Sequence, residues 1–271
     1  MSLTLPVVTI TADTIPEAWE RSLIACWNQG TEIRTQYDGS NDPPSKDCML
    51  LLTVTNPFQE PRIHRAMPGG IADLESYRME VVEGVRDHWI NPELGKWQYS
   101  YSQRLKNYKT DKGKVINQLD YIVDTLVKEP YSRQAQAVLW QPWNDAGYKY
   151  PACLQSIYCR VYGDELVMNV RMRSNDALRA AAMNIYAFTD LQRVIADRVS
   201  EGLGNKIRVG QYNHFVDSYH IYGSCYKQYE GIVSLINKRS FEDRTYITSD
   251  VQYLIDEANA DIKFKLDLEK K

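Results

Sequence analysis

The sequence lacks the features that mark several large classes of protein. Its five cysteines have no regular spacing and include no CxxC pair, so neither a disulfide framework nor a zinc site is expected. No run of five or more basic residues occurs and the net charge is −3, which argues against a nucleic-acid-binding surface. Apolar stretches are too short to span a membrane, and the first residues carry no secretory signal pattern. These absences predict a cytoplasmic protein with free thiols and without a metal, membrane or nucleic-acid partner.

What the sequence does contain is an ordinary globular composition with many aromatic residues. Hydrophobic residues make up 44% and charged residues 25% of the chain, values typical of a folded domain. The 19 tyrosines and 6 tryptophans fit a large packed core, or alternatively a pocket that stacks flat rings. No repeat, low-complexity segment or linker interrupts the chain, so residues 1–271 are expected to form a single domain.

Periodicity and turn residues predict helices and strands in interleaved order. Amphipathic patterns with start and stop signals indicate helices at Thr14–Gln29, Ile71–Val85, Asn117–Lys128 and Ala177–Val199. Apolar and β-branched runs bounded by turns indicate strands at Met49–Thr55, Ala135–Trp140, Leu154–Val161, Glu165–Met172 and Gln211–Ile221. Since the two kinds of element alternate without strict βαβ order, one mixed α/β domain is expected.

The most informative pattern is a set of short motifs in the second half of the chain. Cys153 follows a proline–alanine pair at the start of a predicted strand. Arg173-Ser174-Asn175-Asp176 comes after the next predicted strand, and Asn184 lies in the predicted helix beyond it. Further on, the chain reads DSYHIYG, which contains His220 and Tyr222. Each piece occurs often by chance, whereas the order and separation of all of them together are specific.

This arrangement resembles thymidylate synthase, in which a proline–cysteine pair supplies a thiolate that attacks C6 of a pyrimidine nucleotide. In that family an RSxD signature, an asparagine and an HxY pair follow the cysteine in the same order. The resemblance implies a single three-layer α/β domain built on a large twisted mixed β-sheet. It also implies a transferase that carries a one-carbon unit from 5,10-methylenetetrahydrofolate to C5 of a pyrimidine nucleotide, with dUMP to dTMP as the first choice.

Two alternatives remain open. A 5-hydroxymethylase of the same fold, acting on dUMP, dCMP or CMP, would let water instead of hydride capture the exocyclic methylene. A catalytically inactive relative, kept as a nucleotide-binding or interaction protein, belongs to another functional class. The chain departs from the family pattern at Leu154 and Met172, which replace a histidine and a glutamine, and at LRAAAM, which replaces an LGxPF turn. The C-terminal residues also match poorly, so the resemblance implies a divergent member.

The resemblance implies roles for the candidate catalytic residues. Cys153 corresponds to the nucleophile; taken alone, a cysteine in PACLQSIY is more often a small buried apolar residue, but its spacing to the motifs downstream favours the thiolate. Tyr101 resembles the tyrosine that helps to activate the nucleophile. For the carboxylate that orders water and relays protons, Glu75 lies in the helix where the family carries it, and Glu80 is the alternative. Either glutamate also fits a solvated helix face.

Candidate phosphate ligands come from three parts of the chain. Arg173 and Ser174 resemble the family's phosphate-contacting pair, a fork of N–H donors beside a hydroxyl. Arg133 resembles the arginine that reaches the same phosphate from the other subunit, which implies a homodimer with shared active sites. The family has a second arginine beside it, and a glutamine stands there in this chain. Arg171 and Arg34 are candidates for the missing charge, Arg34 as the flexible-loop arginine.

The base, the sugar and the cofactor have candidate partners as well. Asn184 resembles the asparagine that reads the base, and its carboxamide can pair with N3–H and O4 of uracil at once. The related cytosine hydroxymethylases carry an aspartate at the corresponding place. His220 and Tyr222 resemble the pair that holds the sugar 3′-hydroxyl, although a histidine between aromatic residues also fits a core position. Asp176 resembles the aspartate that hydrogen-bonds the pterin of the folate cofactor.

Overall fold

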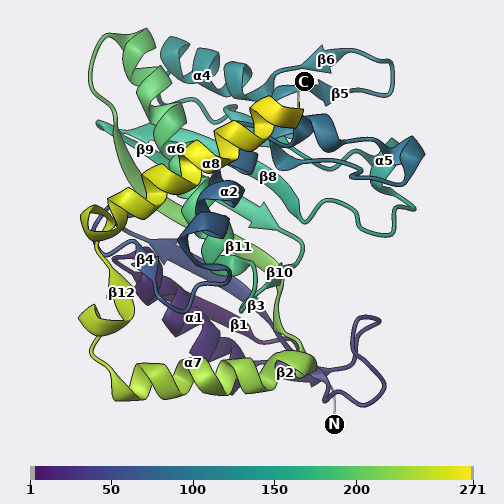
Figure 1. Cartoon of the computed structure of the whole chain (residues 1–271). Coiled ribbons are helices and arrows are strands. Elements are labelled where there is room, and N and C mark those ends of the chain that lie inside the picture. The colour runs from purple at the N-terminus through teal and green to yellow at the C-terminus, as the bar shows by residue number, and fades with distance from the viewer. Residues whose placement is uncertain (1–3, 270–271) are drawn as a thin grey trace.

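A mixed β-sheet of eight strands forms one side of the molecule (Figure 1). The computed structural model describes residues 4–269. Along the sheet the strand order is β1-β3-β11-β9-β8-β7, with β2 paired to β3 and β10 paired to β11. These strands are β1 (Val7–Ala12), β2 (Thr31–Ile33), β3 (Ser45–Val54), β7 (Gln136–Val138), β8 (Leu154–Tyr162), β9 (Glu165–Met172), β10 (Asn175–Asp176) and β11 (Arg208–Ile221). Both parallel and antiparallel pairs occur along it, so the sheet is of the mixed type that the sequence predicts.

The helices form two further layers on one face of the sheet. They are α1 (Ile15–Gln29), α2 (Gly70–Val82), α3 (Tyr101–Lys106), α4 (Gln118–Lys128), α5 (Pro142–Asp145), α6 (Ala181–Leu203), α7 (Tyr226–Lys238) and α8 (Gln252–Glu269). Helices α1 and α6 pack directly on the strands, α2 packs on α6, and α8 crosses α2 on the outside (Figure 1). The predicted three-layer α/β fold on a large mixed sheet is therefore confirmed.

Helix α6 is the central element of the inner helix layer. Most of its side chains are buried, because one side faces the sheet and the other faces α2. Gln192, fully buried in its middle, donates from Nε2 to the carbonyl oxygens of Leu166 and Gly210, which satisfies backbone groups of two strands. The helix ends at Gly204, whose φ of 70° is the left-handed conformation that favours glycine. The Gln192 hydrogen bonds and the Gly204 cap fix the position of α6. They therefore also fix the cavity at its N-terminus.

The opposite face of the sheet is half-exposed. Burial alternates along β1, β3, β8 and β9 as expected for strands with one face toward a core. Several apolar side chains nevertheless point away from the helices; they are Val7, Met49, Leu51, Val167 and Phe215. The helices of the described chain leave this partly apolar face without cover.

The predicted elements mostly lie where the sequence placed them, with one informative difference. The helix expected from Ala177 begins at Ala181, since Asn175–Asp176 first pairs with β11 and the Asp176 carboxylate then accepts the N–H groups of Leu178 and Arg179. Helices α7 and α8 and strand β1 have no counterpart in the sequence prediction. Within residues 4–269, no helix combines the length and the apolar character needed to cross a membrane.

The smaller elements complete the chain. Two short strand pairs lie outside the main sheet, β4 (Ile63–His64) with β12 (Thr245–Tyr246) and β5 (Tyr108–Lys109) with β6 (Val115–Ile116). Five short 3₁₀ turns are η1 (Asp87–Trp89), η2 (Pro92–Leu94), η3 (Gly223–Cys225), η4 (Glu242–Arg244) and η5 (Thr248–Val251). The β4–β12 pair ties the segment before α8 to the first half of the chain.

Candidate active site

The β8–β9 hairpin brings Cys153 and Arg173 together. Leu154 and Met172 pair at the open end of the hairpin, so the residues just outside it face each other. The backbone N–H of Arg173 donates to the carbonyl of Cys153 at 2.9 Å, and the guanidinium Nη2 lies 3.5 Å from the Cys153 sulfur. The same guanidinium donates to the carbonyl oxygens of Pro151 and Ala152. These bonds hold the positive charge beside the thiol.

Two opposing effects act on the Cys153 thiol. Burial raises its pKa, because a thiolate loses solvation there, and the neighbouring Arg173 charge lowers the pKa toward its ordinary value. The balance leaves the pKa raised, so the resting group is a thiol. By contrast, the core thiol of Cys159 has no such cation, and burial alone raises its pKa to about 12. Among the cysteines, Cys153 is also the one that is half-exposed.

Cys153 opens into a cavity of about 400 Å³ where α2, α3, β10, α6 and β11 converge. We refer to it as the Cys153 cavity. Its wall includes most of the residues that the sequence singled out, namely Tyr101, Cys153, Ser174, Asp176, Asn184, His220 and Tyr222. They come from segments far apart in the chain, and the fold places them around one space large enough for part of a small ligand.

Asn184 projects into this cavity from the first turn of α6 and is almost fully buried. Its Oδ1 accepts a hydrogen bond from the hydroxyl of Tyr77 at 2.5 Å, and its Nδ2 donates to Oδ1 of Asn175 at 3.0 Å. The Met172 sulfur lies 3.7 Å from Nδ2. The carboxamide is thus held from three sides.

His220 presents an unused nitrogen to the cavity. Its Nδ1 lies 3.2 Å from the carbonyl oxygen of Ser218, which can only accept, so Nδ1 carries a proton in this contact. Nε2 is buried and has no partner in the described residues. In the neutral ring Nε2 is then an acceptor, suited to a hydroxyl group of a ligand. The ring of Tyr222 packs edge-on against the imidazole with 4.6 Å between centroids.

Two further tyrosines, Tyr77 and Tyr101, belong to the wall of the Cys153 cavity. The pKa values of Tyr77 and Tyr101 are raised well above the ordinary value, first by burial and then by neighbouring groups that include Cys153. Both hydroxyls therefore stay protonated and can donate hydrogen bonds. A smaller adjoining cavity of about 190 Å³ shares these two tyrosines and is also lined by Glu80. Burial raises the pKa of Glu80, and the ion pair with Arg86 at 3.1 Å opposes that shift.

Four of the predicted site residues do not line the Cys153 cavity, namely Glu75, Arg34, Arg133 and Arg173. Glu75 is buried, but its carboxylate accepts hydrogen bonds from Arg78 and Tyr186 within the α2–α6 contact. Arg34 is exposed and donates to carbonyl groups of its own loop, whose Tyr37 packs edge-on against Tyr222. Of the two candidate glutamates, Glu80 thus lies nearer the site.

Two predicted phosphate ligands lie in different settings. Arg133 is exposed between α4 and β7. Arg173 lies beside Cys153 with its guanidinium directed at the hairpin backbone. Since Arg133 was expected to act from the other subunit, its role remains a prediction.

The cavity also contains residues that sequence reasoning missed. Tyr77, Asn175, Arg179 and Met183 belong to its wall. Asn175 is the variable position of the RSxD signature, and Arg179 follows Asp176 within one turn, so the motif itself contained a signal for both. Tyr77 offered none, because its place depends on how α2 packs against α6.

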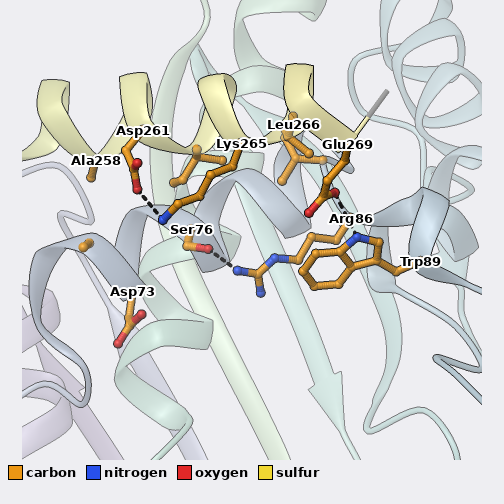
Figure 2. Close-up of a pocket in the computed structure, with 12 residues that line it drawn as sticks. Asp73, Ser76, Arg86, Trp89, Ala258, Asp261, Lys265, Leu266 and Glu269 are labelled. Atoms are coloured by element: carbon orange, nitrogen blue, oxygen red, sulfur yellow. Dashed lines mark hydrogen bonds and ion pairs between the residues drawn. The ribbon is translucent and has the colours of Figure 1, made fainter. Parts of the chain in front are cut away.

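A second cavity, of about 220 Å³, lies between α2 and α8 (Figure 2). Most of its polar side chains already have partners: Arg86 donates to Ser76, Lys265 pairs with Asp261, and Glu269 accepts from Trp89. No cysteine or histidine belongs to its wall. Within residues 4–269 no group of three or more His, Cys, Asp or Glu side chains could hold a metal ion. The Cys153 cavity is therefore the candidate active site.

Comparison with known proteins places the cavity in a wider context. The sequence matches the family model described as thymidylate synthase over residues 70–264, a span that contains the whole cavity wall. A protein of Methanosarcina mazei described as "Putative thymidylate synthase" is 27% identical over 228 residues, which cover 84% of this chain and 95% of the relative. One of Methanocaldococcus jannaschii with the same description is 30% identical over 177 residues, 64% of this chain and 72% of the relative. The thymidylate synthase of Bacillus licheniformis is 32% identical over 109 residues, 40% and 39% of the two chains.

Proposed function

Because the chain belongs to the thymidylate synthase family, whose reaction is one-carbon transfer to C5 of a pyrimidine, we propose that it converts dUMP to dTMP. The one-carbon donor in this proposal is 5,10-methylenetetrahydrofolate. One observation carries the proposal: the only half-exposed cysteine lies beside an arginine in a cavity shared with Asn184 and His220.

Cys153 is the proposed nucleophile. Its thiolate adds to C6 of the pyrimidine and forms a carbon–sulfur bond, which turns C5 into an enolate-like carbon that can attack an electrophile. Arg173 stabilises the thiolate before the addition. When the proton on C5 has been removed, the carbon–sulfur bond breaks and the thiolate is restored. The hydroxyl of Tyr101 can donate to the oxygen on which negative charge develops, whereas the single proton of the Tyr77 hydroxyl is already donated to Asn184.

The remaining polar groups hold the nucleotide. Asn184 pairs with the edge of the base, His220 Nε2 accepts the 3′-hydroxyl proton, and Ser174 with Arg173 contacts the phosphate. The second phosphate arginine, Arg133, comes from another copy of the chain. A second copy would also cover the half-exposed apolar face of the sheet, so we propose a homodimer with shared active sites. Five free thiols suit a reducing compartment, and we propose the cytoplasm.

The residues near Asp176 fit a reduced folate. Asp176 is a carboxylate acceptor for pterin N–H groups, Met183 offers apolar contact, and Arg179 is an exposed cation suited to the acidic tail. When bound, the cofactor supplies the electrophilic carbon and the hydride. Glu80, beside the two tyrosines, is placed to accept a proton by way of ordered water, and we propose it in preference to Glu75 for this role.

A 5-hydroxymethylase remains the second candidate, since LRAAAM stands where the family turn would enclose the folate. The decisive experiment is mass analysis of products from dUMP, UMP, dCMP and CMP with 5,10-methylenetetrahydrofolate. The proposal expects a methylated product and dihydrofolate from dUMP. A 5-hydroxymethyl product with tetrahydrofolate would establish the second candidate. If the folded protein gave no product from any of the four nucleotides, the chain would be a catalytically inactive relative.

A further inference from the structure

A buried chain of hydrogen bonds leads away from Asn184 to a histidine that does not belong to the wall of the Cys153 cavity. Asn184 Nδ2 donates to Asn175 Oδ1 at 3.0 Å, and Asn175 Nδ2 lies 2.9 Å from His214 Nε2. His214 Nδ1 in turn lies 2.8 Å from the hydroxyl of Tyr212. Asn175, His214 and Tyr212 are all buried. The orientation of Asn184 is thus connected to the proton position on His214.

The His214 ring is neutral. Burial lowers its pKa to about 3, and no carboxylate contacts it that would restore a charge. A neutral imidazole has one N–H and one acceptor nitrogen. If Nε2 accepts from Asn175, the proton must be on Nδ1 and must point to the Tyr212 oxygen. If Nε2 carried the proton, it would donate to an oxygen, and the Asn175 amide would have to turn by half a turn.

A half-turn of the Asn175 amide would also reorient Asn184. With its NH₂ group directed at Asn184, Asn175 would require an oxygen there, so Asn184 would turn as well. The hydroxyl of Tyr77 can donate to Oδ1 or accept from Nδ2, and it therefore allows both arrangements. The Met172 sulfur allows only one of the two arrangements, because a thioether can accept a hydrogen bond but cannot donate one. It favours the arrangement in which Asn184 Nδ2 faces the sulfur.

From these contacts we propose that Asn175 and His214 determine which pyrimidine the site accepts, by fixing the orientation of the Asn184 carboxamide. The inference rests on the proposed function, in which Asn184 reads the base. Uracil presents a donor at N3 and an acceptor at O4, and cytosine presents the reverse pattern. As long as the Asn175 amide links the two residues, the arrangement with Nδ1–H on His214 sets Asn184 for uracil, and the opposite tautomer sets it for cytosine. His214 is a positioning residue, since it acts through Asn175.

Two substitutions are expected to shift the preference in opposite directions. His214→Phe removes the acceptor for Asn175 Nδ2; because an orphaned buried N–H is less tolerable than an under-satisfied oxygen, both amides turn. The ratio of kcat/KM for dUMP to that for dCMP should fall about tenfold. Asn175→Asp can only accept from Asn184, which locks the uracil orientation, and the ratio should rise about threefold or more.

Tyr219→Phe is the matched control. It removes a buried hydroxyl from β11, the strand that also carries His214. The Tyr219 hydroxyl is bonded to Ser22 at 2.8 Å, and Tyr219 does not belong to the cavity wall. The ratio should stay unchanged in this variant even if stability falls. A general loosening of the site would lower the ratio in all three variants, and that result would overturn the proposal.

Nitrogen NMR of His214 gives a test that does not depend on activity. The proposal expects a neutral ring with the proton on Nδ1, and a proton on Nε2 in Asn175→Asp. A proton on Nε2 of the wild type together with a uracil preference would overturn it. Calorimetric binding of dUMP and dCMP separates the two proposals: binding with the predicted shifts but no turnover counts against the proposed function alone. Turnover with an unshifted ratio counts against the role of His214 and Asn175 alone.

Discussion

A guanidinium nitrogen of Arg173 lies 3.5 Å from the sulfur of Cys153, although the two residues are 20 positions apart. The register of the β8–β9 hairpin accounts for this, because the pair Leu154 and Met172 places the residues that flank them opposite each other. A local hairpin thus places a cation beside the thiol. We expect the reactivity of Cys153 to depend on that contact.

Arg173→Ala should make Cys153 less reactive. Without the cation, burial acts alone, the pKa of the thiol rises further, and the thiolate fraction at neutral pH falls. Iodoacetamide should alkylate the variant severalfold more slowly at neutral pH, with the rate recovering as the pH rises. Arg171→Ala is the control, because Arg171 is exposed and pairs with Asp217. Equal alkylation profiles for wild type and Arg173→Ala would contradict a role for Arg173 in activation.

Cys153→Ala and Cys153→Ser should lose turnover by several orders of magnitude, because neither side chain supplies a thiolate. Neither variant should form a covalent adduct with a 5-fluoropyrimidine nucleotide, as judged by protein mass. Cys159→Ala serves as control: Cys159 is a fully buried core residue on the same hairpin, and its loss should affect stability more than kcat. Full activity in Cys153→Ala would end the proposed mechanism.

Glu80→Gln should lower kcat, whereas Glu75→Gln should act chiefly on stability. Only Glu80 adjoins the two cavity tyrosines, and Glu75 is bonded to Arg78 and Tyr186. Since a base works only when deprotonated and burial raises the pKa of Glu80, wild-type activity should fall as the pH drops through that raised pKa. The acid limb of the pH–rate profile should disappear in Glu80→Gln. The opposite ranking of the two variants would return the role to Glu75.

Arg133→Ala and Cys153→Ala should each be inactive alone and regain part of the activity when mixed. Heterodimers would contain one site with both an intact thiol and an intact partner arginine. Activity should be measured after subunit exchange, which mass spectrometry of the intact dimer can follow. Proven exchange without recovery would show that Arg133 does not serve the other subunit. Arg160→Ala, which changes an arginine of β8, paired with Cys153→Ala gives the control.

Glu20→Gln should lower the free energy of unfolding by about 3 kcal/mol, because it breaks a buried ionic cluster. The Glu20 carboxylate accepts from His64 and Arg244, joining α1 to the β4–β12 pair. Burial alone would raise the pKa of Glu20, but these two partners lower it overall. The stabilisation is therefore present above the unfolded pKa and is lost as the pH falls through the folded one, so the gap between wild type and variant should narrow in acid.

Urea titrations at several pH values would measure this gap. Glu17→Gln is the matched control on the same helix, since the Glu17–Arg21 pair is exposed and such pairs contribute less than about 1 kcal/mol. A constant gap across the acid range would show that the charge of Glu20 does not stabilise the fold.

The sequence alone determined the parts of this protein that depend on neighbours along the chain. Alternating residues predicted β8 and β9, the turn between them fixed the hairpin, and the hairpin register put Cys153 beside Arg173. The helix signals at Asn117 were equally local: its side chain accepts the N–H groups of Leu119 and Asp120, as the residue type indicates. Motif order and spacing were enough to indicate the family.

Only the tertiary structure decided which distant groups share the cavity. Glu75 and Glu80 lie on one helix and differ in the sequence only by position, but the packing of α2 on α6 directs one into an ionic network and the other toward the tyrosines. Tyr77 and His214 meet the Asn184 network because β11 and α2 lie on either side of α6. Burial shifts the pKa values of Cys153 and His214. It arises from layers assembled across the whole chain, and no local sequence pattern indicates it.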